Sequence, residues 1–141
     1  MPEFSAGQKA TWTKTITEAD VYAFAGITGD FNPLHVDREY AARSRFKERI
    51  AHGMLTAGLV SAVLGMRLPG PGGVFVSQTV KFVRPVRFGD TITAQAEVLR
   101  WEVERRILTL RTTCTNQRGE TVLEGEAALL VEGPEGPRKQ E

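Results

Sequence analysis

The spacing of hydrophobic residues changes once along the chain, near residue 73. Before that point apolar residues recur three and four positions apart, as at Val21, Phe24 and Ala25, which is typical of helices with one buried face. After it apolar and polar residues alternate, which is typical of β-strands. The pattern predicts helices mainly in the first half of the chain and strands in the second half.

The first half is expected to begin with a strand, because Trp12 and Ile16 lie on one side of a short run rich in threonine. Thr17 has the side chain of a helix N-cap, and Gly26 and Gly29 are expected to close the helix that follows.

Two more helices are expected before residue 73. A short, mostly polar helix is predicted over residues 37–46, with Asp37 as its cap. Residues 53–68, GMLTAGLVSAVLGMRL, are apolar around the whole circumference of a helix, so this helix has to be buried on most sides. The LPGPGG run after it ends the helix.

Four strands are predicted in the second half, with turns at 89–90 and 116–119. Consecutive strands joined by short turns pair antiparallel. The later strands are expected within residues 92–98, 108–114 and 121–131. The first strand is expected to carry Val74, Val76, Val80 and Phe82 on one face.

These elements predict an α+β fold, in which a long, curved antiparallel sheet wraps around the central buried helix. A single sheet of this kind leaves an edge strand and some apolar surface exposed, so we expect at least a homodimer. Residues 1–132 are expected to form one domain. The tail over residues 133–141, rich in Gly, Pro and charge, is expected to be flexible.

Composition narrows the functional classes. The 141 residues include 41% hydrophobic and 25% charged residues, as in globular proteins. A net charge of +1 does not attract nucleic acid or an anionic membrane. The single cysteine, Cys114, excludes an internal disulfide and is expected to be an inert core thiol. Without a signal peptide or a run long enough to span a bilayer, the protein is expected to be cytoplasmic.

The stretch GDFNPLH, residues 29–35, carries an acid, an amide and an imidazole close together. Pro33 stiffens the loop, and a tight turn can bring Asp30 and His35 to one water molecule as a general acid–base pair. The alternative is structural: Asp30 forms an Asx turn, Asn32 caps locally and His35 is an ordinary polar residue. Loop chemistry alone favours this alternative.

Gly53 is the second candidate. It begins the buried helix, where its N–H points outward and its bare backbone lets a ligand approach. Such a donor can stabilise an oxyanion. The alternative is that Gly53 is small for steric reasons and that His52 only leads into the helix. Because residues 54–66 contain no acid, base or histidine, acid–base groups must come from elsewhere, and the GDFNPLH loop is the best candidate.

The stretch DFNPLH fits the D-x-N-P-x-H hydratase motif. With IAHGMLTAGLVSAVLGMRLPG (50–70) and FVSQTVKFVRPVRFGD (75–90), the chain resembles the MaoC-like (R)-specific enoyl-CoA hydratases over about residues 10–131. The resemblance implies the hot dog fold, dimerised into a continuous sheet. It also implies hydration of trans-2-enoyl-CoA to (R)-3-hydroxyacyl-CoA, and it leaves open whether the pathway is polyester supply or fatty acid breakdown.

The resemblance also implies roles for individual residues. Asp30 and His35 would be the catalytic pair, Asn32 would position water or substrate, and the Gly53 amide would bind the thioester oxygen. We favour Asp30 as the base and His35 as the proton donor to C2. No metal or cofactor is required, because CoA is part of the substrate, and the chain is expected to lack a cysteine–histidine ligand cluster.

Five further residues are weaker candidates. Ser61 and Leu64 lie on the helix that is expected to border the acyl tunnel, although each can equally be a core residue. Positive charges that could meet CoA phosphates, or could simply be solvated, are Lys81, Arg84 and Arg87.

Two rival functions differ in testable ways. A hot dog thioesterase or carrier-protein dehydratase usually has a carboxylate on or beside the central helix, and residues 53–66 have none. A non-catalytic acyl-CoA-binding hot dog subunit would be expected to have lost Asp30 or His35, and both are present.

Overall fold

The computed structural model describes residues 3–133, so the predicted tail, apart from Gly133, lies outside the described residues. Its centre is one sheet of five strands in the order β1-β3-β4-β5-β2, and each neighbouring pair is antiparallel, as predicted. The strands are β1 (Lys9–Thr15), β2 (Gly73–Phe82), β3 (Thr91–Glu102), β4 (Ile107–Thr115) and β5 (Thr121–Val131).

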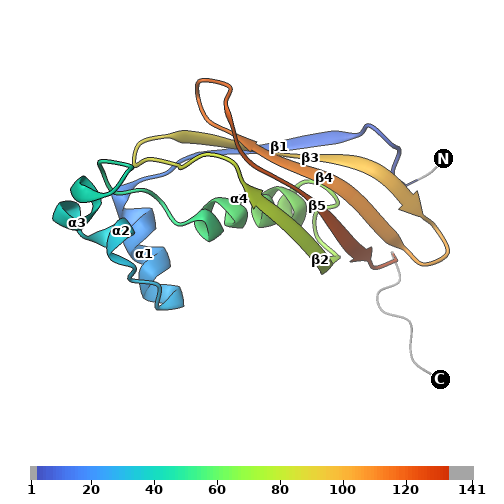
Figure 1. Cartoon of the computed structure of the whole chain (residues 1–141). Helices are drawn as coiled ribbons and strands as arrows, with labels where there is room; N and C mark the ends of the chain where they lie inside the picture. Colours follow the sequence, from blue (N-terminus) through green and yellow to red (C-terminus); the bar gives the residue numbers. More distant parts are fainter. Residues whose placement is uncertain (1–2, 134–141) are drawn as a thin grey trace.

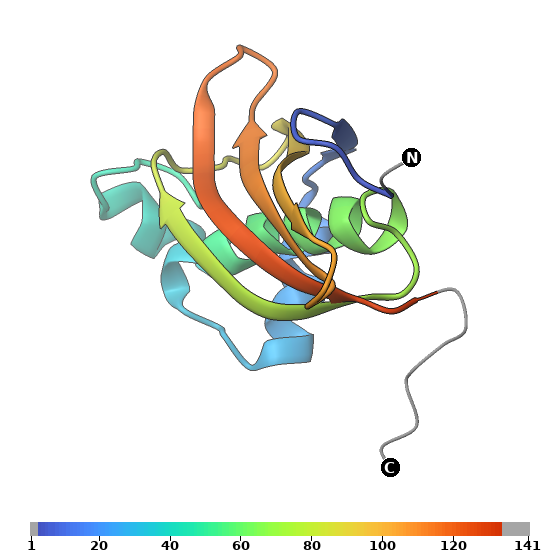
Figure 2. The same ribbon diagram turned by 90° about the vertical axis from the view of Figure 1, so that its right-hand side faces the viewer.

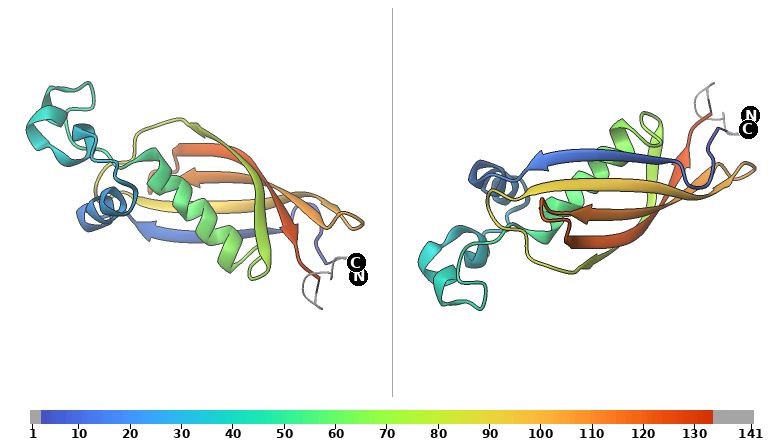
Figure 3. Two further views of the ribbon diagram at one scale, coloured as in Figure 1. Left: turned by 90° about the horizontal axis from the view of Figure 1, so that it is seen from below. Right: turned by 90° about the horizontal axis from the view of Figure 1, so that it is seen from above.

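The longest helix, α4 (Gly53–Met66), lies against the concave side of this sheet, and the sheet curves around it (Figures 1 and 2). Three shorter helices, α1 (Glu18–Thr28), α2 (Pro33–Val36) and α3 (Arg38–Arg43), gather at the end of the sheet where α4 begins (Figure 3). No helix within residues 3–133 has the length and apolar character needed to cross a membrane.

The core lies between α4 and the sheet. Leu59, Val60, Val63 and Leu64 of α4 are buried and belong to the same cluster as the inward-facing residues of the strands. Each aliphatic side chain that is fully buried contributes about 1.5–3 kcal/mol relative to an exposed one. This packing fixes the position of the first turn of α4, which borders the candidate site.

The prediction for α1 is confirmed at its start and wrong in one detail at its end. Thr17 Oγ1 accepts from Asp20 N at 3.1 Å, and Asp20 Oδ2 accepts from Thr17 N at 2.9 Å, which forms a capping box. Gly29 ends the helix with a left-handed φ of 85°, whereas Gly26 lies inside it. Only the glycine with positive φ is a helix terminator.

The polar helix predicted over residues 37–46 is shorter than expected. Asp37 caps α3 as predicted, accepting from the backbone N–H groups of Glu39 and Tyr40. The helix ends at Arg43 because Ser44 adopts an extended conformation and its hydroxyl donates to the Ala41 carbonyl at 2.6 Å.

The face predicted for β2 is wrong in its first part. The pairing of β2 with β5 shifts register between Phe75 and Ser77, which leaves a bulge at Val76. A bulge inserts one residue and reverses the alternation of faces. Val74 therefore pairs with Leu130 and lies on the face opposite Val80.

The prediction that the central helix is buried on most sides does not hold for one stripe of α4. Met54 and Met66 are 59% and 64% exposed, and Gly58 and Ser61 are also exposed. This stripe lies beside β2, an edge strand of the sheet that itself exposes Phe75 and Val76. These two residues line one pocket together with Met54, Gly58 and Ser61 of the stripe.

Candidate active site

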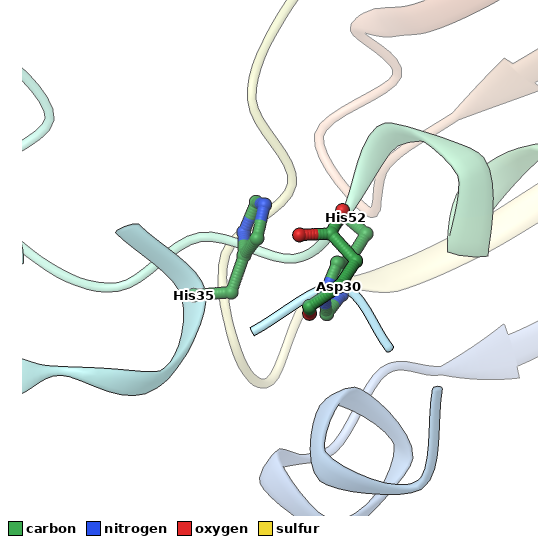
Figure 4. A group of neighbouring side chains, drawn as sticks. All are labelled: Asp30, His35 and His52. Carbon is green, nitrogen blue, oxygen red and sulfur yellow. The ribbon is translucent and has the colours of Figure 1, made fainter. Parts of the chain in front are cut away.

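The GDFNPLH loop makes the local hydrogen bonds that its residues favour. Asn32 N donates to Asp30 Oδ1 at 3.1 Å, which is an Asx turn. Asn32 Oδ1 accepts from Leu34 N at 3.1 Å and caps α2, whose first residue is Pro33. The predicted alternative, an Asx turn at Asp30 and a local cap at Asn32, is therefore confirmed. The same turn and the short helix after it, which the sequence analysis did not predict, carry His35 back toward Asp30 (Figure 4).

His35 is buried, with 9% of its surface exposed, and its Nδ1 lies 2.7 Å from the carbonyl oxygen of Ile50. A carbonyl only accepts, so Nδ1 carries the ring proton and Nε2 of the neutral ring carries the lone pair. Burial lowers the pKa of His35, and the nearby His52 lowers it further, against the opposing effects of the Ile50 bond and Asp30. His35 is therefore suited to accept a proton through Nε2.

His52 is a site residue that the sequence analysis missed, because it was interpreted only as leading into the helix. It is 2% exposed, and its Nε2 lies 2.9 Å from the carbonyl oxygen of Asp30. Its ring centroid is 4.0 Å from that of His35 and 4.7 Å from that of Phe24. An AHG sequence at the start of an apolar helix was the only signal in the chain that could have pointed to it.

The structure brings three side chains together. Asp30, His35 and His52 each offer an oxygen or nitrogen atom within 4.8 Å of the others (Figure 4). Among the described residues, they form the group whose atoms could hold a metal ion, and this group contains an aspartate and two histidines but no cysteine. One nitrogen of each imidazole already binds a backbone carbonyl. That the reaction needs no metal or cofactor remains a prediction.

A pocket of about 380 Å³ joins this cluster to the start of α4. Asp30, His35 and Gly53 all line it. Gly53 is the first residue of α4, where an N–H has no acceptor within the helix. Within residues 3–133, the N-cap His52 gives no side-chain capping bond. The end of the helix therefore presents a free donor to the pocket.

Gly53 also has the steric role that the alternative proposed. A Cβ at this position would lie 2.7 Å from Cε1 of Phe82. The absence of a side chain therefore lets β2 approach the first turn of α4. The two interpretations of Gly53 are compatible, because the same close approach shapes the pocket beside its amide.

The three positively charged candidates for CoA binding lie in different surroundings. Arg84 lines the pocket, although its Nη1 donates to the Thr121 carbonyl at 2.8 Å. Arg87 is paired with Glu48 at 2.8 Å. Lys81 is highly exposed on β2 and lies outside that pocket's lining. Arg45, which the sequence analysis missed, also lines the pocket. Contact of any of these residues with CoA remains a prediction.

The two candidates for the acyl pocket, Ser61 and Leu64, also lie in different surroundings. A second pocket, of about 490 Å³, lies between α4 and β2, and Ser61 lines it together with Phe75 and Gln78. Leu64, by contrast, is 1% exposed in the core. Cys114 is fully buried, and burial raises the pKa of its thiol to about 12, as expected for an inert core thiol.

A curved sheet around one helix, with an acid–imidazole pair at the N-terminus of that helix, defines a hot dog protein with an acid–base site. The MaoC like domain family matches residues 3–118. The chain belongs to this family.

Particular relatives match over nearly the whole chain. An (R)-specific enoyl-CoA hydratase of Rhodospirillum rubrum is 53% identical over 92% of this chain and 89% of its own length. A 3-hydroxybutyryl-CoA dehydratase of Methylorubrum extorquens is 51% identical over 91% of this chain and 78% of its own length. Among solved structures, R-hydratase PhaJ1 of Pseudomonas aeruginosa superposes with a TM-score of 0.86 at 41% identity, covering 98% of this chain and 93% of that one. The predicted hot dog fold is confirmed.

Proposed function

We propose that the protein is an (R)-specific enoyl-CoA hydratase, a hydro-lyase that adds water to trans-2-enoyl-CoA and gives (R)-3-hydroxyacyl-CoA. The observation that carries the proposal is the bond between His35 Nδ1 and the Ile50 carbonyl, which leaves Nε2 of His35 in one pocket with the Asp30 side chain and the Gly53 amide. The high identity to relatives named as hydratase and dehydratase supports the same reaction in its two directions.

The first half of the mechanism is nucleophilic attack. Water is a weak nucleophile, so it needs proton acceptors at the moment of attack. Nε2 of His35 and the carboxylate of Asp30 are two such acceptors that share one pocket. As the water oxygen bonds to C3, negative charge moves to the thioester oxygen. The N–H of Gly53 would stabilise that charge by about 3 kcal/mol, as single oxyanion donors do.

The second half is protonation of C2. Because Nδ1 of His35 binds the Ile50 carbonyl, Nε2 of the neutral ring holds no proton before the reaction. The water molecule supplies the hydroxyl for C3, and the proton that it loses is the one available for C2. The group that accepts this proton therefore delivers it, to the same face. His35 can act as the donor to C2, as we favoured, only after its Nε2 has accepted the proton.

The test is direct. Crotonyl-CoA is mixed with the pure protein, and the ultraviolet absorbance of the enoyl thioester is followed while the configuration of the product is determined. We expect loss of absorbance and an (R) product. Loss of absorbance with release of free CoA thiol would indicate a thioesterase instead. No reaction with crotonyl-CoA or with a longer enoyl-CoA would refute the hydratase proposal.

We propose further that the protein is a homodimer through β2, acting in the cytoplasm. Both edges of the sheet carry lysines, Lys9 and Lys14 on β1 and Lys81 on β2, but only β2 also exposes large apolar side chains, Phe75 and Val76. A second copy would cover β2 and the exposed stripe of α4. Sedimentation analysis should give twice the mass of the chain, and Phe75→Asp should lower it to that of one chain.

A further inference from the structure

We infer that His52 is a positioning residue: its Nε2–H holds the backbone of Asp30 in place, and its ring seats His35 beside it. The inference rests on the proposed hydratase function. His52 makes both contacts at once, with 2.9 Å between Nε2 and the Asp30 carbonyl oxygen and 4.0 Å between its ring centroid and that of His35.

The hydrogen bond to Asp30 has a fixed direction. The Asp30 carbonyl only accepts, so Nε2 of His52 is the nitrogen that carries the proton. Within residues 3–133, Nδ1 of His52 is buried and has no hydrogen-bond partner. The ring therefore has one bonded nitrogen, and that nitrogen binds the backbone of the catalytic loop.

Among the described residues, this bond is the one distant hydrogen bond of residues 29–33, the part of the loop that contains Asp30. Residues 29–33 are all exposed. Among the described residues, their other hydrogen bonds join groups at most four positions apart in sequence. The bond from His52 spans 22 positions. Without it, local turns would shape the loop but nothing polar would tie Asp30 to the start of α4.

The position of His52 in the sequence connects the acid–base loop with the proposed oxyanion donor, Gly53. It is the N-cap of α4, directly before Gly53. One residue thus sets the distance between the Asp30 backbone and the Gly53 amide. A misplacement of about 1 Å at a reacting group can lower the rate by roughly 10²-fold.

The ring of His52 has a separate effect on His35. It contacts the rings of both His35 and Phe24, and it lies at 32° to the ring of His35. This contact helps to keep water from one face of His35. The pocket at the start of α4, which His35 and His52 line, also contains the charged or titratable side chains of Asp30, Arg45 and Arg84.

Two variants separate the hydrogen bond from the ring. His52→Phe keeps a ring against His35 but removes the donor. His52→Gln keeps an N–H near the position of Nε2 but removes the ring. We expect His52→Phe to lower kcat for crotonyl-CoA by roughly 10- to 100-fold, with KM changed less than about threefold. We expect His52→Gln to restore at least about a third of the wild-type kcat.

Two measurements without substrate accompany the kinetics. Amide hydrogen exchange over residues 29–35 should accelerate in His52→Phe and stay near the wild-type rate in His52→Gln. The chain has two histidines, so after removal of any tag the single imidazole signal of each variant belongs to His35. Nitrogen NMR should still find the proton on Nδ1 in both variants.

The outcomes are distinct. Full kcat in His52→Phe, or equal losses in both variants that follow their melting temperatures, would overturn the inference. If His52→Phe does not fold, His52→Gln and His52→Asn, whose shorter side chain cannot reach the Asp30 carbonyl, carry the same comparison. If the wild type hydrates no enoyl-CoA, the proposed function fails, while hydrogen exchange still decides whether His52 holds the loop.

Discussion

Two pockets border α4 and differ in the side chains that line them: the first, here called the polar end, contains the candidate acid–base residues, and the second, the apolar end, has no charged or titratable side chain among the described residues that line it. At the N-terminal end, Asp30, His35 and Gly53 line a pocket of about 380 Å³, and backbone carbonyls fix the imidazoles around it. Further along α4, a pocket of about 490 Å³ lies between this helix and β2 and is lined mainly by apolar groups. Ser61 lines this pocket and is exposed. Met54 borders both. One chain therefore brings the candidate acid–base residues together by itself, whereas the second pocket is open at the exposed surface of α4 and β2.

The largest effect should come from removing the acid–base groups at the polar end. Asp30→Asn keeps the oxygen that accepts from Asn32 N, and His35→Asn keeps a donor for the Ile50 carbonyl. Each variant therefore preserves the local structure while removing a proton acceptor. We expect kcat to fall by roughly 10²- to 10⁴-fold, with melting temperatures close to that of the wild type. Near-normal turnover in either variant would place the chemistry elsewhere.

The next effect concerns the amide donor. In Gly53→Ala the new Cβ would meet the ring of Phe82, so the first turn of α4 or the ring has to move. We expect kcat to fall by roughly 10- to 100-fold, because the donor is displaced from the developing oxyanion. The double variant Gly53→Ala with Phe82→Leu should recover part of the rate. If the single variant lowers only stability and not kcat, the Gly53 amide is not the donor.

A smaller and selective effect should mark the apolar end. Ser61→Leu narrows the pocket between α4 and β2 without touching the acid–base groups. We expect kcat/KM for octenoyl-CoA to fall by about tenfold, the scale of a steric misfit in an apolar pocket. The value for crotonyl-CoA should change less than about twofold, and Ser61→Ala serves as the matched control. Equal losses for both substrates would remove Ser61 from the acyl pocket.

The smallest effect is a displacement of the pH profile. Burial lowers the pKa of His35 from its ordinary value of 6.5. As pH falls through the lowered pKa, Nε2 gains a proton and can no longer accept one from water, so activity is lost on the acid side. The loss assigned to His35 should therefore be centred below pH 6.5. Titration of the His35 imidazole by NMR checks this value, and a midpoint above pH 6.5 would contradict it.

The fold was largely predictable because its signals are local. The strand predicted over residues 121–131 matches β5, and the caps Thr17 and Asp37 lie where their side chains indicated. The bulge at Val76 was not predictable, because it depends on how β2 meets β5 and not on the sequence of β2 alone. The exposed stripe of α4 was missed because its residues are apolar or small and alternate with buried ones.

The candidate site also contains some residues that the sequence could predict and others that it could not. Asp30 and His35 were accessible to sequence reasoning because both belong to one short motif. His52 was not, since its partners are the backbone of Asp30 and the ring of His35, and neither contact follows from spacing or hydrophobicity. The state of His35 was also inaccessible, because it depends on a carbonyl that every amino acid possesses.

That carbonyl has a consequence for how the protein tolerates mutation. The partner of His35 Nδ1 is the backbone of Ile50, so no substitution at position 50 deletes the acceptor. Random libraries at this position should return many apolar residues that leave the imidazole in the same tautomer. The carbonyl is instead held by its neighbours: Ile50 N donates to the Leu34 carbonyl at 3.3 Å, and Ala51 N donates to the Val86 carbonyl at 2.7 Å. Natural variation can therefore reshape the side chains here freely while the backbone path stays under selection.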